Sequence, residues 1–113
     1  MSDRDDRAPL RDMLGAAQEA VNLFESATAD ELETDRRTHL ALLHLIVIVG
    51  EAANRVSAER QKAHSAIPWP DVIGMRNRLV HGYDQVDREV VHDTVAVDLP
   101  RLIALVQAIL AEE

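Results

Sequence analysis

The chain has 113 residues, 47% of them hydrophobic, and this length predicts a single domain over residues 1–113, because a second domain has no room. It contains no cysteine, which excludes disulfides and thiolate metal sites and favours a cytoplasmic protein. The formal net charge of −8 argues against a broadly basic nucleic-acid binder, so only a local cluster of basic residues could bind RNA or DNA.

The first predicted helix covers roughly residues 8–26. The following residues, 26–35, contain Ser, Thr and Asp capping residues and several acids, so we expect a connection with room for one short turn of helix. The first helix is predicted from apolar residues at spacings of three and four, namely Leu10, Met13, Leu14, Ala17, Val21 and Phe24.

A second helix is expected to begin at Thr34 or Asp35 and to continue to about residue 60. Its middle, ALLHLIVIVGEAA, is apolar on more than one side, and the surplus apolar surface predicts a homodimer. The β-branched run 46–49 could instead form a buried strand, but its helix-favouring flanks make a helix the better interpretation. The apolar run 40–49 is interrupted by His44 and is too short to span a bilayer, so we expect no membrane partner.

The stretch KAHSAIPWPDVIG interrupts the helices, since two prolines bracket Trp69, which we expect to anchor this loop in the core. A third helix should start near here and end at Gly82. Asp87 can cap a last helix, which Pro100 should kink. The expected buried stripe of this last helix consists of Val91, Val95, Leu99, Leu102, Val106 and Ile109.

Four helices without strand alternation or internal repeats predict an all-α fold, an antiparallel four-helix bundle.

The segment RNRLVHGY places Arg76, His81 and Tyr83 around the end of the third helix. Five residues of continuous helix correspond to a rotation of about 140°, so Arg76 and His81 would not face the same point on one helix. Either the helix ends at Gly82 and lets the chain turn, or a second protomer completes the site.

These side chains are suited to metal-free RNA cleavage. A histidine can take a proton from a ribose 2′-hydroxyl, and an arginine can neutralise the charge that develops on the attacked phosphate. Such a reaction would leave a cyclic phosphate and could not cut DNA. The simpler interpretation is a capped helix end, with His81 near the C-terminus, Gly82 as the cap and the Tyr83 ring packed on the core.

At these residues the chain closely resembles the HEPN superfamily, specifically the HepT-like proteins. Their signature is Arg, four to six residues, His, one residue and Tyr, and Arg76, His81 and Tyr83 match it. The similarity continues through IPWPDVIGMRNRLVHGYDQVD, the GEAANRVS of the second helix and the DLP of the last one, and so covers essentially the whole chain.

The resemblance implies a homodimeric four-helix toxin ribonuclease that needs no metal and no cofactor, with the signatures of two protomers lining one cleft. It also implies a cognate nucleotidyltransferase antitoxin that attaches AMP to the signature tyrosine. Carried over, Arg76 stabilises the phosphate, His81 transfers protons, and Tyr83 supports the site and is the AMPylation target.

Other polar residues are weaker candidates for support of the cleft. Glu51 and Arg55 lie four apart on the second helix, so they could form an intrahelical ion pair or line the cleft. Asn77 and Arg78 flank the signature, and Arg78 could add charge there or remain solvated.

No histidine spacing suggests a metal site. The alternative function is a non-catalytic helical module that binds a nucleotidyltransferase, although the intact pair of Arg76 and His81 favours the enzyme.

Overall fold

The computed structural model describes the backbone of residues 2–79 and 87–112, with side chains described from residue 7 onward. Every regular element in these ranges is helical, which confirms the all-α prediction. The elements in chain order are α1 (Ser2–Ser26), α2 (Ala29–Thr34), α3 (Arg36–Arg55), α4 (Ala58–Ala63), α5 (Trp69–Ile73), α6 (Met75–Leu79), α7 (Arg88–Asp93), the π-helical turn η1 (Thr94–Asp98) and α8 (Leu99–Ala111).

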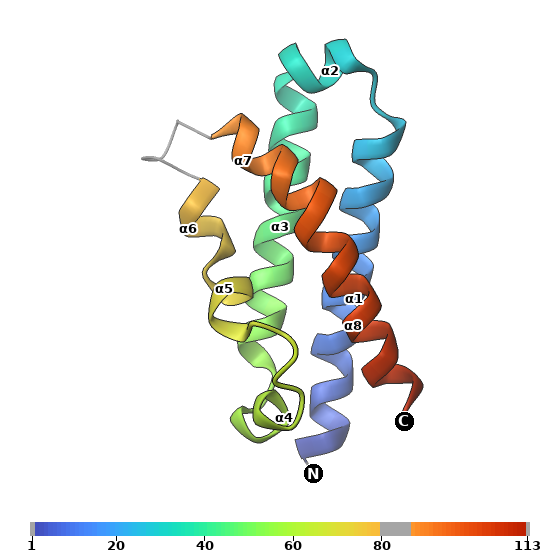
Figure 1. The fold of residues 1–113 in the computed structure, drawn as a ribbon, viewed down its shortest axis with the longest axis vertical. Helices are drawn as coiled ribbons and strands as arrows, with labels where there is room; N and C mark the ends of the chain where they lie inside the picture. Colours follow the sequence, from blue (N-terminus) through green and yellow to red (C-terminus); the bar gives the residue numbers. More distant parts are fainter. Residues whose placement is uncertain (1, 80–86, 113) are drawn as a thin grey trace.

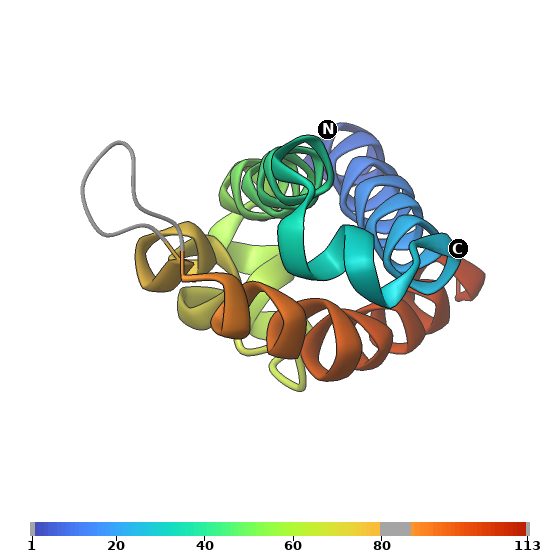
Figure 2. The same cartoon turned by 90° about the horizontal axis from the view of Figure 1, so that it is seen from above.

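Three long helices enclose the core, namely α1, α3 and the continuous helix formed by α7, η1 and α8. Figure 1 shows the chain running up α1, down α3, up through α5 and α6, and down the last helix. Seen from above in Figure 2, α5 and α6 fill the side between α3 and the last helix. The short helices α5 and α6 therefore take the place of one long helix of the predicted antiparallel bundle.

Side-chain caps fix where the helices begin. The Thr28 hydroxyl accepts from the Glu31 N–H, and the Glu31 carboxylate accepts from the Thr28 N–H, so α2 opens with a capping box. Asp35 caps α3 by accepting from the Arg37 N–H and from the Thr38 hydroxyl. Asp87 caps α7 through the Val90 N–H. The short helix after residue 26 and the caps at Asp35 and Asp87 confirm the predictions.

Three predicted helix boundaries were wrong: the start of the first helix, the end of the second, and the continuity of the third. α1 begins at Ser2 and passes through Pro9, which follows about two turns of helix and removes only the one backbone hydrogen bond that its nitrogen cannot donate. α3 ends at Arg55, and the Ser57 hydroxyl accepts from the Arg60 N–H to start a separate helix. The predicted third helix is divided at Gly74, whose N–H bonds back to the Pro70 and Val72 carbonyls of α5.

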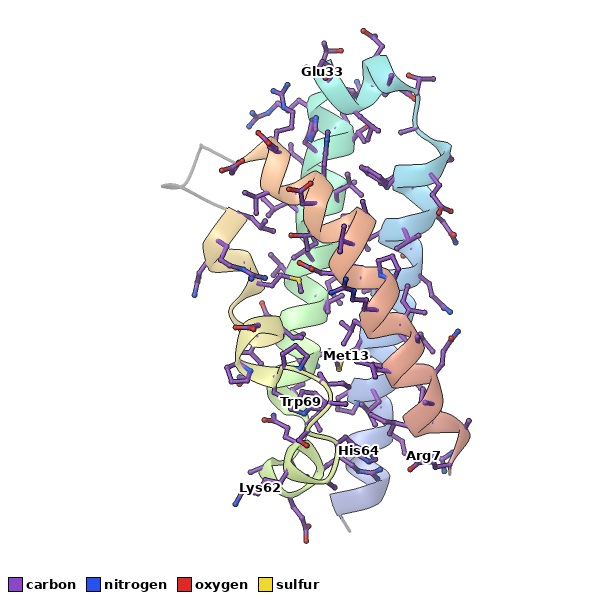
Figure 3. All side chains as sticks on the ribbon, in the orientation of Figure 1. Arg7, Met13, Glu33, Lys62, His64 and Trp69 are labelled. Atoms are coloured by element: carbon purple, nitrogen blue, oxygen red, sulfur yellow. The ribbon has the colours of Figure 1, made fainter. Side chains whose placement is uncertain are left out.

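The core forms where these helices meet. Trp69 is 5% exposed and its indole N–H donates to the His64 carbonyl at 3.1 Å, which confirms it as the anchor of the proline-rich stretch (Figure 3). The predicted stripe of the last helix is confirmed too, since its six members are all buried: Val91, Val95, Leu99, Leu102, Val106 and Ile109.

The last helix accommodates Pro100 with a π-helical turn rather than a simple kink. The Leu99 N–H bonds to the Thr94 carbonyl five residues back, one position before the proline, which can donate no hydrogen bond. Residues 88–111 are also long and apolar enough to cross a bilayer, unlike the run 40–49, the only stretch considered from the sequence, which is too short. Their apolar stripe packs on α1 and α3, as expected of a core helix.

Gly50 sets the distance between α3 and α5. A Cβ atom at this position would lie 3.1 Å from the backbone oxygens of both Val72 and Ile73. Such contacts are closer than van der Waals distance, so the two helices could not keep their present separation with any larger residue. Gly15, on the exposed side of α1, has nothing within 4 Å of the corresponding point.

Three aromatic rings, from α1, α3 and α7, pack together at the end of the bundle that lies near α2. His39 of α3 stacks on His92 of α7 with ring centroids 5.3 Å apart, and Phe24 of α1 meets His92 edge-on at 5.5 Å. Neither ring nitrogen of His39 has a hydrogen-bond partner among the described residues. Burial lowers the pKa of His39 below its ordinary value because it penalises the charged form. The nearby backbone of Leu32 and the Asp35 carboxylate oppose this shift, whereas the charges of Arg88 and His92 add to it.

We expect Gly50→Ala to lower the free energy of unfolding by about 1–3 kcal/mol, because the methyl group must push α5 away from α3. Gly15→Ala, in open space on a helix, should raise it by about 0.5–1 kcal/mol. Urea denaturation followed by circular dichroism measures both. Equal stabilisation by the two substitutions would show that α5 does not pack tightly on Gly50.

Acidification should destabilise the fold through His39. The lowered pKa means that the unfolded chain takes up the proton first as pH falls below about 6.5, so unfolding becomes easier by at most about 1.4 kcal/mol per pH unit. In His39→Phe, which keeps an aromatic ring against His92, the free energy of unfolding should vary less between pH 7.5 and 5. The matched control is His44→Phe, on the exposed side of α3, which should retain the wild-type slope. An unchanged slope in His39→Phe would contradict the assignment.

Candidate functional site

Arg76 lies on α6, a helix of one turn fixed at both ends by buried residues. Met75 and Leu79 are 3% and 0% exposed, and they hold α6 against α3 and the last helix. The three residues between them, Arg76, Asn77 and Arg78, are all exposed. The Asn77 N–H donates to the Gly74 carbonyl at 2.9 Å, so the turn after α5 leads directly into this helix.

A pocket of about 350 Å³ lies between α3 and α6, and Arg76 is one of the residues that line it. Residues of α3 line it at spacings of three and four, so one face of that helix forms one wall. The end of α5 and the start of α6 form the other. Its lining consists of Val47, Gly50, Glu51, Asn54, Arg55, Ile73, Arg76 and Asn77.

Five polar side chains in this pocket make no hydrogen bond or ion pair with any described residue. Glu51 and Arg55 therefore do not form the intrahelical ion pair that their spacing allowed. The structure instead brings both to the same pocket as Arg76 and Asn77, although Glu51 and Arg76 are 25 positions apart in the sequence. Unused donors and acceptors gathered in one cavity can bind a polar ligand without breaking protein contacts.

Asn54 is the member of this pocket that sequence reasoning missed. It carries no recognisable motif, but it lies three residues after Glu51 and next to Arg55 on α3. That spacing alone places Glu51, Asn54 and Arg55 on one helical face and could have identified it.

Arg78 lies in a different pocket from Arg76. Two residues of helix correspond to about 200° of rotation, so the two guanidinium groups leave opposite sides of α6. Arg78 lines a cavity of about 300 Å³ against the last helix, where Arg101, Asp71 and Asp98 also lie. Within one protomer the structure does not bring Arg78 together with Arg76.

His81 and Tyr83 lie outside the described residues. The residues that flank them are held together, since the Asp87 N–H donates to the Leu79 carbonyl at 2.7 Å. The chain therefore leaves and re-enters the described structure at one point, the end of α6. Among the described residues, no three His, Asp or Glu side chains are grouped so that they could hold a metal ion.

Comparison with known proteins places the chain among ribonucleases. It is 32% identical over 96 residues to "Probable ribonuclease HepT" of Thermococcus cleftensis, an alignment that covers 81% of this chain and 87% of the relative. It is 26% identical over 102 residues to "Putative RNase MJ1380" of Methanocaldococcus jannaschii, covering 90% of this chain and 94% of the relative. No solved structure is significantly similar. The family described as "Ribonuclease HepT-like" matches residues 13–109, and the chain therefore belongs to the HepT-like ribonuclease family.

Proposed function

We propose that this protein is a metal-independent endoribonuclease and the toxin of a toxin–antitoxin pair in the cytoplasm. The observation that supports this most is Arg76, which lines an open polar pocket and makes no hydrogen bond or ion pair with a described residue. A cation held in this way can bind a phosphate of RNA bidentately. The chain also belongs to a ribonuclease family.

In the proposed reaction the ribose 2′-hydroxyl attacks the adjacent phosphorus. His81 takes the hydroxyl proton, the bond from O2′ to phosphorus forms, and the bond from phosphorus to the 5′ oxygen breaks as that oxygen takes a proton from water. His81 then returns its proton to the solvent. Arg76 neutralises the charge that builds up on the phosphate oxygens in the transition state. The products are a 2′,3′-cyclic phosphate and a free 5′-hydroxyl.

The active form in this proposal is a homodimer. Leu40, which is 45% exposed, and the half-buried Val47 lie on the α3 face that continues to Glu51 and the pocket. Burying this apolar surface against a second copy would place the partner protomer at the mouth of the pocket. In a shared cleft, Arg76 of one protomer could face His81 of the other, although about 140° would separate the two on one continuous helix.

Regulation by a cognate nucleotidyltransferase antitoxin completes the proposal. Each AMP unit attached to Tyr83 would add a negative phosphate and considerable bulk beside the RNA site. The modified tyrosine would then compete with RNA for the same arginines.

We expect the purified protein to cleave RNA in EDTA, and Arg76→Ala or His81→Ala to lower the rate at least about a hundredfold. Arg101→Ala and Arg11→Ala are matched controls, since these exposed arginines lie outside the Arg76 pocket and away from α3, and they should cleave like the wild type. Rates are measured on a labelled oligonucleotide, and a 2′-deoxy substitution at the cleaved position should block the reaction. Full activity in His81→Ala would reject the catalytic assignment and favour a non-catalytic module that binds the nucleotidyltransferase.

Incubation with the cognate nucleotidyltransferase and ATP should add AMP-sized increments to the mass of the protein. Tyr83→Phe, which differs from the wild type only by the hydroxyl that accepts AMP, should gain none. Intact-mass spectrometry distinguishes the two results. Increments retained in Tyr83→Phe would place the modification elsewhere.

A further inference from the structure

The pocket between α3 and α6 has an apolar floor beneath its polar rim. Val47 and Ile73 are half-buried, and Gly50 between them is buried and carries no side chain. Because α5 approaches Gly50 so closely, the floor is shallow and made of small or aliphatic groups. The rim is formed by exposed carboxylate, amide and guanidinium groups from both helices.

This combination suits a single unstacked nucleotide. At about 350 Å³ the pocket lies at the small end of ligand sites, which are usually apolar with a few polar groups that fix orientation. A nucleobase would cover Val47 and Ile73 with its flat face and present its hydrogen-bonding edge to the rim. Sequence-specific recognition of single-stranded RNA relies on such unstacked bases.

Glu51 restricts which base can bind. A carboxylate only accepts hydrogen bonds, so it needs adjacent donors and repels lone pairs. Guanine presents N1–H and N2–H₂ side by side, whereas adenine and cytosine place a ring-nitrogen lone pair next to their single amino group. Uracil has one N–H between two carbonyl oxygens. Guanine alone offers two adjacent donors to Glu51.

Asn54 completes the guanine edge from the same face of α3. Its amide can donate to the guanine O6 acceptor while Glu51 accepts from the two nitrogens, since the two side chains are three residues apart on one helix. Arg55 and Arg76, also in the pocket, are then available for the flanking phosphates. No other polar group of a described residue engages these side chains.

We propose that this pocket selects guanine in the RNA substrate, with Glu51 and Asn54 as the specificity-determining residues. The assignment rests on the proposed ribonuclease function, because it names the base that the same site prefers. It assigns to Glu51 a role in recognition rather than in proton transfer.

Binding of mononucleotides tests the pocket without any need for cleavage. The 3′-monophosphates of guanosine, adenosine, cytidine and uridine are titrated into ¹⁵N-labelled protein, and the side-chain NH₂ signals of Asn54 and Asn77 are followed by NMR. We expect the guanosine nucleotide to shift both signals and to bind at least about tenfold more tightly than the other three. Glu51→Gln exchanges one acceptor for a donor and should abolish this preference.

Glu19→Gln, the same exchange on the exposed side of α1, is the matched control and should retain the preference. Equal affinity for the four nucleotides, no shift at Asn54 or Asn77, or a preference that survives in Glu51→Gln would each overturn the inference. Guanosine binding by a protein that never cleaves RNA would refute the proposed nuclease and leave the pocket assignment intact. RNA cleavage with no preference for guanine would support the proposed nuclease and refute the assignment of the pocket to guanine.

Discussion

The close approach of α5 to Gly50 is the contact on which the rest of the site depends. Backbone oxygens of Val72 and Ile73 lie where a side chain at residue 50 would begin, so α5 sits directly on α3. Met75 and Leu79 then hold the next turn of helix in the core. Because these two side chains are buried, the residues between them face outward, and Arg76 lines the pocket beside α3.

This arrangement would allow an acidic chain to bind RNA as proposed. The net charge of −8 repels phosphate over the surface as a whole, but Arg55 and Arg76 meet in one cavity whose only acidic member among the described residues is Glu51. In the proposed complex Glu51 contributes to base recognition. Its carboxylate does not attract phosphate, but it accepts hydrogen bonds from a base that presents N–H donors. Weak overall affinity and strong local selection then arise from the same charge distribution.

Local signals in the sequence predicted local structure well. The caps at Asp35 and Asp87 were predictable because a carboxylate and the N–H that it binds lie within three residues of each other. The division of α5 from α6 at Gly74 was not, because it depends on packing against α3. The sequence left two alternatives for Glu51 and Arg55, an intrahelical ion pair or a place in the cleft beside Arg76, and only the fold decides between them. Asn54 had no motif to mark it.

The central claim is that RNA binds between α3 and α6 with a phosphate at Arg76. A crystal structure with a short, non-cleavable RNA that carries a 2′-O-methyl group at the cleaved position tests this most directly. We predict a phosphate within hydrogen-bonding distance of Arg76 and a base resting on Val47 and Ile73. RNA bound against the last helix at Arg78 and Arg101, with the pocket beside α3 empty, would contradict this claim.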